Sequence, residues 1–165
     1  MPSERALTPQ EQNQFRECAE SGLKMLNLKG RTVTPVSAAL AVQKYVDGWH
    51  SRPSGFFAGF LNRRPGTIDA ALALGTVWGD QLVGKFNWQW TCVNDGTGDY
   101  YCVAAPDRSL VAYPTYFVRE CLEDPEVDCK LMLAFNMLSA GKIPPQPAHG
   151  FANLLDGVHR IVPGR

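Results

Sequence analysis

The sequence predicts an α+β fold, in which N-terminal helices and a central helix pack on a small antiparallel sheet of about three strands and two C-terminal helices follow. Three observations lead to this class. Residues 67–100 pass from an apolar face of helical period to the two-residue alternation of a strand. Helix-start signals precede this stretch, and apolar patterns of helical period resume after Pro114. A helix and a hairpin therefore form the predicted centre of the fold.

The chain has the size and composition of one globular domain. It contains 165 residues, of which 45% are hydrophobic and 19% charged, and this balance is typical of a folded chain with one core. We expect a single domain over residues 1–165. Its predicted parts are a helical segment at 1–66, a helix-sheet-helix core at 67–140 and an extended tail at 141–165.

Charge is balanced over the whole chain but not along it. The 16 basic and 16 acidic residues cancel to a formal net charge of zero. Residues 1–64 carry nine Lys/Arg and five Asp/Glu, a net of +4, whereas residues 65–165 carry seven and eleven, a net of −4. Because a neutral chain has no global field that attracts phosphates, we expect neither nucleic acid nor membrane as a partner.

The sequence shows neither a membrane span nor a metal motif. No apolar run approaches the length of about 20 residues that crosses a bilayer, and the polar N-terminus lacks the apolar core of a signal peptide. We therefore expect a cytoplasmic protein. Its five cysteines are odd in number and show no CxxC spacing, and its three histidines are scattered. No metal and no cofactor are expected.

Two helices are predicted before the central stretch. The first begins near Thr8, which starts a capping-box pattern completed by Glu11, and it ends before Lys29-Gly30. The second begins at Thr34-Pro35 and ends before Gly48. Each carries an apolar stripe, so both are interpreted as scaffold.

Residues 49–66 mix aromatic side chains with proline, glycine and arginine, and we interpret them as a structured loop. One turn of helix is expected at Phe56–Leu61. The adjacent Arg63-Arg64 is interpreted as a solvated part of this loop. His50 has no nucleophile or acid nearby in the sequence, so a structural role is preferred.

The central helix begins after Pro65-Gly66 and contains two glycines one turn apart, Gly75 and Gly79. Glycine destabilises a helix interior by about 1 kcal/mol relative to alanine, so this pair predicts the close approach of another backbone, either the sheet or a second helix. A dimer face is the alternative. Asp80 follows the second glycine and is interpreted as orienting the chain near the sheet.

The hairpin is predicted from the alternation over 88–93, a turn at Asn94–Asp99 and a return strand at Tyr100–Ala105. A three-residue loop would place Cys92 opposite Cys102, and a four-residue loop would place Cys92 opposite Tyr101. Neither register requires a disulfide in a reducing compartment. The turn lacks the glutamate that completes an EF-hand loop, so we interpret it as a tight polar turn.

The rest of the chain is predicted as a third strand at Ser109–Tyr113, helices at Pro114–Leu122 and Val127–Ala140, and a tail with a short helical turn at Phe151–Leu155. Five acids crowd the connection between the two helices. They are either a solvated corner or an acidic lip that meets a basic partner, because clustered charge accelerates and orients encounter. These acids are Glu120, Glu123, Asp124, Glu126 and Asp128.

Several short motifs occur in a recognisable order: Leu74-Gly75 and Gly79, then Trp88 or Trp90, the turn Asn94-Asp95-Gly96, and Pro114. Over residues 67–140 this order resembles a bacterial family of uncharacterised small α+β domains. The resemblance implies an α+β fold and a bacterial origin. It supplies no catalytic residues.

The preferred function is a non-catalytic protein-binding domain, because the chain contains no GxSxG, Walker, GxGxxG, HxxxH or CxxC motif. By class-level analogy we expect an immunity protein, which neutralises a bacterial toxin by covering its active site. The alternative is a small enzyme whose site brings Asp80 or a cysteine, Cys92 or Cys102, to His50. The predicted contact residues are aromatic anchors and acids. They are Trp88, Asp95, Asp99, Tyr100, Tyr101, Asp107, Tyr113, Glu120, Glu123, Asp124, Glu126 and Asp128.

Overall fold

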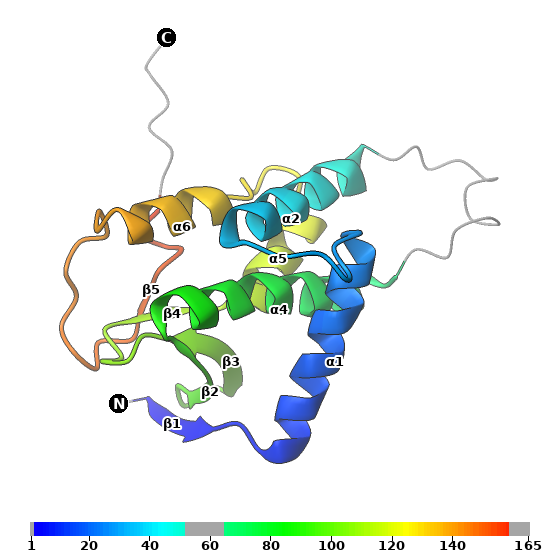
Figure 1. Cartoon of the computed structure of the whole chain (residues 1–165). Helices are drawn as coiled ribbons and strands as arrows, with labels where there is room; N and C mark the ends of the chain where they lie inside the picture. Colours follow the sequence, from blue (N-terminus) through cyan, green and yellow to red (C-terminus); the bar gives the residue numbers. More distant parts are fainter. Residues whose placement is uncertain (1, 52–64, 159–165) are drawn as a thin grey trace, which may run out of the picture.

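A computed structural model describes residues 2–51 and 65–158 and confirms the α+β class. In Figure 1, α4 lies between the sheet on one side and the neighbouring helices α2 and α6 on the other. In chain order the elements are β1 (Ser3–Ala6), α1 (Pro9–Met25), α2 (Pro35–His50), α4 (Thr67–Phe86), β2 (Gln89–Asn94), β3 (Asp99–Ala104), β4 (Leu110–Ala112), α5 (Pro114–Glu123), α6 (Leu131–Ser139) and β5 (Ala152–Asn153).

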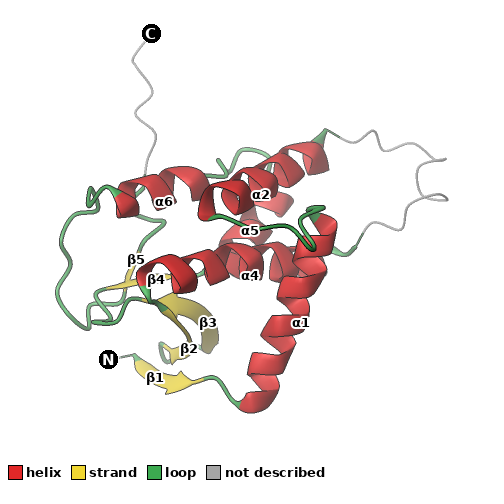
Figure 2. Cartoon of the chain, in the orientation of Figure 1, coloured by secondary structure: helices red, strands yellow, loops and turns green. Residues whose placement is uncertain are grey.

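The sheet has five strands in the order β1-β2-β3-β4-β5, two more than expected (Figure 2). The three predicted strands form its antiparallel centre, with β1 added antiparallel at one edge and β5 added parallel to β4 at the other. Both extra strands are short, and every residue of β1 is exposed. An edge strand of this kind is defined by its distant hydrogen-bonding partner, so the local pattern contained no signal for it.

Residues 142–150 of the predicted tail contain no helix or strand and are largely exposed, whereas its residues 152–158 pack on the core. Residues 152–153 form β5 instead of a helical turn, because Leu154 N donates to Val111 O at 2.7 Å. Leu154, Leu155 and Val158 are then buried in the main hydrophobic cluster. The last described residues therefore close the core beside β4.

The hairpin adopts the four-residue loop, so Cys92 lies opposite Tyr101 and Cys102 lies opposite Thr91. Residues 92 and 102 therefore point to opposite faces of the sheet, because directly paired residues share a face and neighbours along a strand alternate. Both thiols are free and buried. A disulfide between them would require a change of register.

The predicted close approach of another backbone to α4 is confirmed at Gly75, whereas Gly79 is approached by a side chain, and the chain itself supplies both neighbours. A Cβ on Gly75 would lie 2.5 Å from Thr115 Cα, so the backbone of α5 crosses α4 there. A Cβ on Gly79 would meet the ring of Trp90 from β2. This face of α4 is covered within the chain and does not require a dimer.

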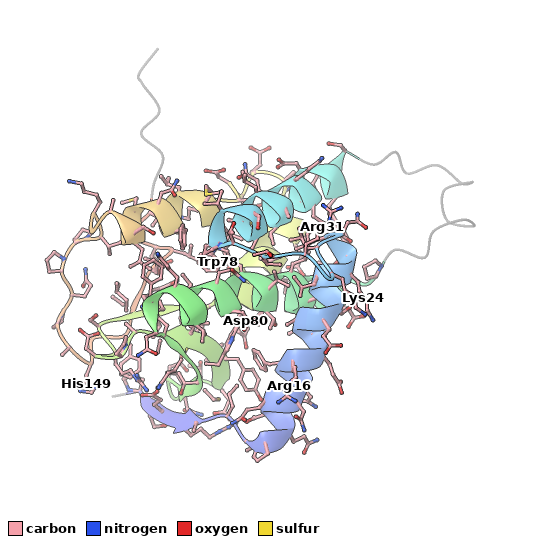
Figure 3. All side chains as sticks on the ribbon, viewed as in Figure 1. Arg16, Lys24, Arg31, Trp78, Asp80 and His149 are labelled. Atoms are coloured by element: carbon pink, nitrogen blue, oxygen red, sulfur yellow. The ribbon has the colours of Figure 1, made fainter. Side chains whose placement is uncertain are left out.

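Trp78 and Asp80 lie on opposite sides of α4 and contact different parts of the fold. Figure 3 places Trp78 on the side of α4 that faces α2, and Asp80 on the side of the sheet. Trp78 is fully buried, and its Nε1 finds no hydrogen-bond partner among the described residues. Asp80 accepts a hydrogen bond from Trp90 Nε1 at 2.8 Å, which fits the predicted role of orienting the chain near the sheet.

Neither α4 nor any other described helix has the length and apolar character needed to cross a bilayer.

The N-terminal helices begin where the capping box at Thr8 and the start signal at Thr34-Pro35 predicted. Thr8 Oγ1 accepts from Glu11 N at 3.2 Å while Glu11 Oε2 accepts from Thr8 N at 2.7 Å, and Thr34 forms the equivalent pair with Ser37. The second helix continues past Gly48 instead of ending before it. Its last turn is held by a 2.7 Å hydrogen bond between His50 Nε2 and Cys121 O.

The last helix is shorter than predicted, starting at Leu131 instead of Val127. Asp124 organises a turn before it by accepting from Glu126 N at 2.9 Å through Oδ1 and from Val127 N at 3.2 Å through its carbonyl. The expected helical turn at Phe56–Leu61 and the arginines 63–64 lie outside the described residues.

Candidate functional site

Four of the predicted contact residues line one groove, although they come from four different segments. Asp95 lies in the hairpin loop, Tyr100 in β3, Tyr113 between β4 and α5, and Glu120 in α5. The groove has a volume of about 550 Å³, and we call it the acidic groove. Its lining is Asp95, Tyr100, Tyr113, Tyr116, Phe117, Glu120, Phe151, Asn153, Leu155 and Asp156.

Tyrosine rings form a packed cluster in the acidic groove. The ring centroid of Tyr116 lies 5.7 Å from that of Tyr100 and 6.3 Å from that of Tyr113. The hydroxyl of Tyr100 is hydrogen-bonded to Thr97 Oγ1 at 2.9 Å. Tyr116 is nevertheless 36% exposed. These rings are thus held in place on one side and open on the other, as contact aromatics at interfaces are.

The groove is negatively charged, because Asp95, Glu120 and Asp156 line it and none of its described lining residues is basic. Asp95 Oδ1 accepts from Thr97 Oγ1 at 2.6 Å and from Thr97 N at 2.8 Å, and these bonds hold the pKa of the carboxyl below its ordinary value. Burial raises the pKa of Tyr113 to about 12, so this hydroxyl stays neutral at physiological pH. The surface presents carboxylates beside neutral aromatic rings.

A second groove, of about 740 Å³, lies where α1 meets the N-terminal half of α4, and we call it the apolar groove. Tyr116 lines both grooves, so they adjoin at this ring. Arg119 is the one basic residue among its described lining residues, and it pairs with Glu123 at 2.7 Å. The lining is Gln14, Phe15, Glu17, Cys18, Ser21, Ile68, Asp69, Ala71, Leu72, Ala73, Thr76, Tyr101, Thr115, Tyr116 and Arg119.

Tyr101 points to the opposite face of the sheet from Tyr100, and it belongs to the apolar groove. Its hydroxyl donates to Glu11 Oε1 at 2.7 Å, and its ring packs on Phe15 with centroids 5.4 Å apart. Both oxygens of Glu11 also accept from Arg5, at 2.8 and 2.9 Å, and this pairing holds the pKa of Glu11 well below its usual range. Tyr101 therefore joins β3 to the start of α1 at one end of the groove.

Trp88 is not available to a partner, which corrects its assignment as an anchor. Its side chain is 4% exposed and belongs to the main hydrophobic cluster. Asn87 before it adopts a left-handed conformation with φ of 57°, and the chain reverses there between α4 and β2. This reversal turns the indole into the core.

The remaining predicted acids lie outside the acidic groove and have local roles or stay exposed. Asp99 accepts from Asn94 Nδ2 at 2.7 Å, and Asp107 Oδ1 accepts from Ser109 Oγ at 2.7 Å within the β3–β4 turn. Glu123 is the partner of Arg119, and Asp124 stabilises the turn before α6, as described above. Glu126 and Asp128 are exposed beside that turn. The sequence cluster of five acids is therefore not one surface, because only Glu120 reaches the groove.

The residues named for an enzyme site are engaged elsewhere in the fold. Asp80 is bonded to Trp90, and His50 to the carbonyl of Cys121. Burial raises the pKa of Asp80 and raises that of Cys102 to about 12. Neither groove is lined by these residues or by Cys92, as far as the described lining extends. Residues 2–51 and 65–158 also contain no group of three His, Cys, Asp or Glu side chains placed to hold a metal ion.

Sequence reasoning missed more than half of the acidic groove. The sequence could have placed Tyr116 beside Tyr113 and Glu120, because these residues are spaced by three and four positions and so share one side of the segment that forms α5. Residues 151–156 had none, because the parallel pairing of β5 with β4 brings them there. The missed lining residues are Tyr116, Phe117, Phe151, Asn153, Leu155 and Asp156.

Comparison with known proteins finds a family model that matches part of the chain. A family model described as a domain of unknown function, DUF3806, matches residues 62–132. The chain is similar to that uncharacterised family over the range that contains α4, the hairpin and α5, which includes Asp95, Tyr100, Tyr113 and Glu120. The match does not include α1 or residues 151–156. No curated protein and no solved structure matches the chain.

Proposed function

We propose that this chain is a non-catalytic protein-binding domain that holds a basic segment of a partner protein in the acidic groove. One observation carries the proposal. Three carboxylates and five aromatic rings from the hairpin, α5 and the tail line a single groove, with no base among the described lining residues. Such a surface complements lysine and arginine, which pair with carboxylates and lie over tyrosine rings.

Charge favours a protein partner over the other macromolecules. Phosphate backbones and anionic membranes are repelled by a groove that carries three acids. Tyrosines held by their neighbours contribute contact area with little loss of conformational freedom, which is how aromatic residues come to dominate protein interfaces. The proposal therefore excludes nucleic acid and membrane as ligands.

The narrower proposal is an immunity protein that acts in the bacterial cytoplasm and neutralises a toxin domain by covering its active site. An active site that binds phosphate groups is basic, and the acidic groove complements such a site. The similarity to a family of unknown function is compatible with this role and names no activity. The immunity assignment rests on this charge complementarity and on class-level analogy.

The test is co-purification of the full chain with the product of each neighbouring gene, followed by calorimetry. We expect one partner to bind below micromolar Kd, and we expect Asp95→Lys combined with Glu120→Lys to weaken that binding by about a hundredfold, as loss of paired interface charges does. Glu126→Lys is the matched control, because it reverses an exposed acid outside the groove.

Two outcomes contradict the proposals separately. Micromolar or weaker binding to every neighbouring product, with no rescue of growth against a toxin, removes the immunity assignment. Tight binding that the double reversal leaves unchanged removes the acidic groove as the contact surface.

A further inference from the structure

The apolar groove is walled by helical rows of side chains that are exposed or partly exposed among the described residues. From α4, Ile68 and Leu72 are four residues apart and are 58% and 38% exposed, although ten of the 20 residues of this helix are buried. From α1, Phe15 and Cys18 are three residues apart and face them across the groove. Exposed apolar side chains gathered in one concavity mark a binding surface more than scattered ones do.

The crossing of two helices shapes this concavity. Figure 1 shows α1 running away from α4 at an angle. The two helices touch at Gly22, where a Cβ would meet the carbonyl of Ala73 and the side chain of Val77. Below this contact, Phe15 packs on Trp90 with ring centroids 4.6 Å apart, so its ring is supported from behind in the wall that α1 provides. A groove with apolar walls suits the apolar face of a helix.

The charges around both grooves are complementary to a basic ligand. Glu17 and Asp69 lie at the apolar groove, in addition to the three acids of the acidic groove. Against these five acids, the described lining contains one base, Arg119, which is paired with Glu123. A ligand that spans both grooves must therefore combine an apolar face with positive charge.

We infer that the partner's contact segment is a basic amphipathic helix, whose apolar face lies against Ile68, Leu72 and Phe15 and whose basic side chains reach Asp95 and Glu120 past the shared ring of Tyr116. This inference rests on the proposed function of the acidic groove. It adds the identity of the binding element, because the apolar groove and the acidic groove adjoin at Tyr116.

The experiment selects ligands for the full chain from a displayed library of random peptides of about 16 residues, which is long enough for about four helical turns. We expect the enriched peptides to carry apolar residues at steps of three and four together with several lysines or arginines. Their affinity is measured by fluorescence anisotropy. Ile68→Glu and Leu72→Glu are expected to weaken binding at least about tenfold, since each places a charge in the apolar contact.

Val36→Glu and Leu40→Glu are the matched controls, because these residues are 47% and 52% exposed on α2, outside both grooves.

The rate at which Cys18 is alkylated measures occupancy of the apolar groove without any substitution in the groove. This cysteine is partly exposed whereas the other four cysteines are buried, so alkylation of the native chain reports on this thiol. A bound helix in the apolar groove is expected to slow that alkylation at least about tenfold.

Each other result is decisive. Enriched basic peptides that lack helical periodicity, that depend on Asp95 and Glu120 and that leave the alkylation of Cys18 unchanged overturn the inference and keep the proposed function. Selection of uncharged apolar peptides, or of no basic peptide at all, overturns both this inference and the proposed function.

Discussion

The joint between α4 and the sheet and the acidic groove use aromatic residues in opposite ways. At the joint, Trp88 is enclosed by its own chain and belongs to the main hydrophobic cluster. In the acidic groove, Tyr100, Tyr113 and Tyr116 pack on one another and keep one side in solvent. An aromatic ring enclosed by its own chain stabilises the fold, whereas a ring supported from one side is available to a partner.

The two regions also differ in how the chain builds them. The joint comes from one continuous stretch, in which α4 leads through Asn87 into the hairpin, and Gly79 of α4 leaves room for the ring of Trp90 from β2. The acidic groove comes from the hairpin loop, β3, α5 and residues 151–156, which only the completed sheet brings together. Substitutions at the joint are therefore expected to change stability, and substitutions in the groove to change binding.

The largest expected effect is at Trp88. Trp88→Ala removes a buried indole and is expected to lower the free energy of unfolding by about 4 kcal/mol, because the lost burial and the residual cavity add. Tyr100→Ala is expected to lower it by less than about 1 kcal/mol, since this ring is only half buried. Urea unfolding followed by circular dichroism measures both. Equal losses for the two variants would contradict the distinction between joint and groove.

Next in size is the substitution at the crossing of α4 and α5. Gly75→Ala is expected to destabilise the fold by about 3 kcal/mol, since its Cβ would press on the backbone of α5, which cannot give way as a side chain can. Gly84→Ala is the control in the same helix. Nothing lies within 4 Å of the Cβ it would add, so it is expected to stabilise the chain by about 1 kcal/mol. Thermal melts that rank the two variants in the reverse order would contradict the close contact.

The smallest expected effect is a difference in pH dependence between Asp80 at the joint and Glu11 in the first turn of α1. Burial raises the pKa of Asp80, so its contribution to stability falls as pH rises from 3.8 through the raised value. The pairing with Arg5 lowers the pKa of Glu11, so its contribution is present above pH 4.5 and is lost as pH falls below it. Asp80→Asn should therefore be relatively more stable at neutral pH than in acid, and Glu11→Gln relatively less stable.

Stability measured against pH for each variant and the unsubstituted chain checks these two signs. Asparagine keeps an oxygen that accepts from Trp90 Nε1, so Asp80→Asn tests the charge without removing the hydrogen bond. If both variants displaced the pH profile in the same direction, the opposite environments assigned to the two carboxyls would be wrong.

The sequence by itself determined the elements whose causes are local. The capping boxes at Thr8 and Thr34 define where α1 and α2 begin, because the capping partners lie three residues apart. The central helix, the hairpin and the close contacts at Gly75 and Gly79 likewise follow from periodicity, turn chemistry and helix propensity. Four groove residues, Asp95, Tyr100, Tyr113 and Glu120, were also in the predicted contact set, because their residue types and positions were typical of an interface.

Only the tertiary structure decided the sheet edges, the role of the tail and the boundaries of both grooves. β1 and β5 are strands because β2 and β4 offer them hydrogen bonds from far along the chain. Trp88 is buried and Tyr100 is partly exposed because different neighbours pack on them. The alternation of residues along a strand does not show which neighbours these are. Periodicity records which residues share a face, whereas burial and grooves depend on what packs against that face, and this is a property of the whole fold.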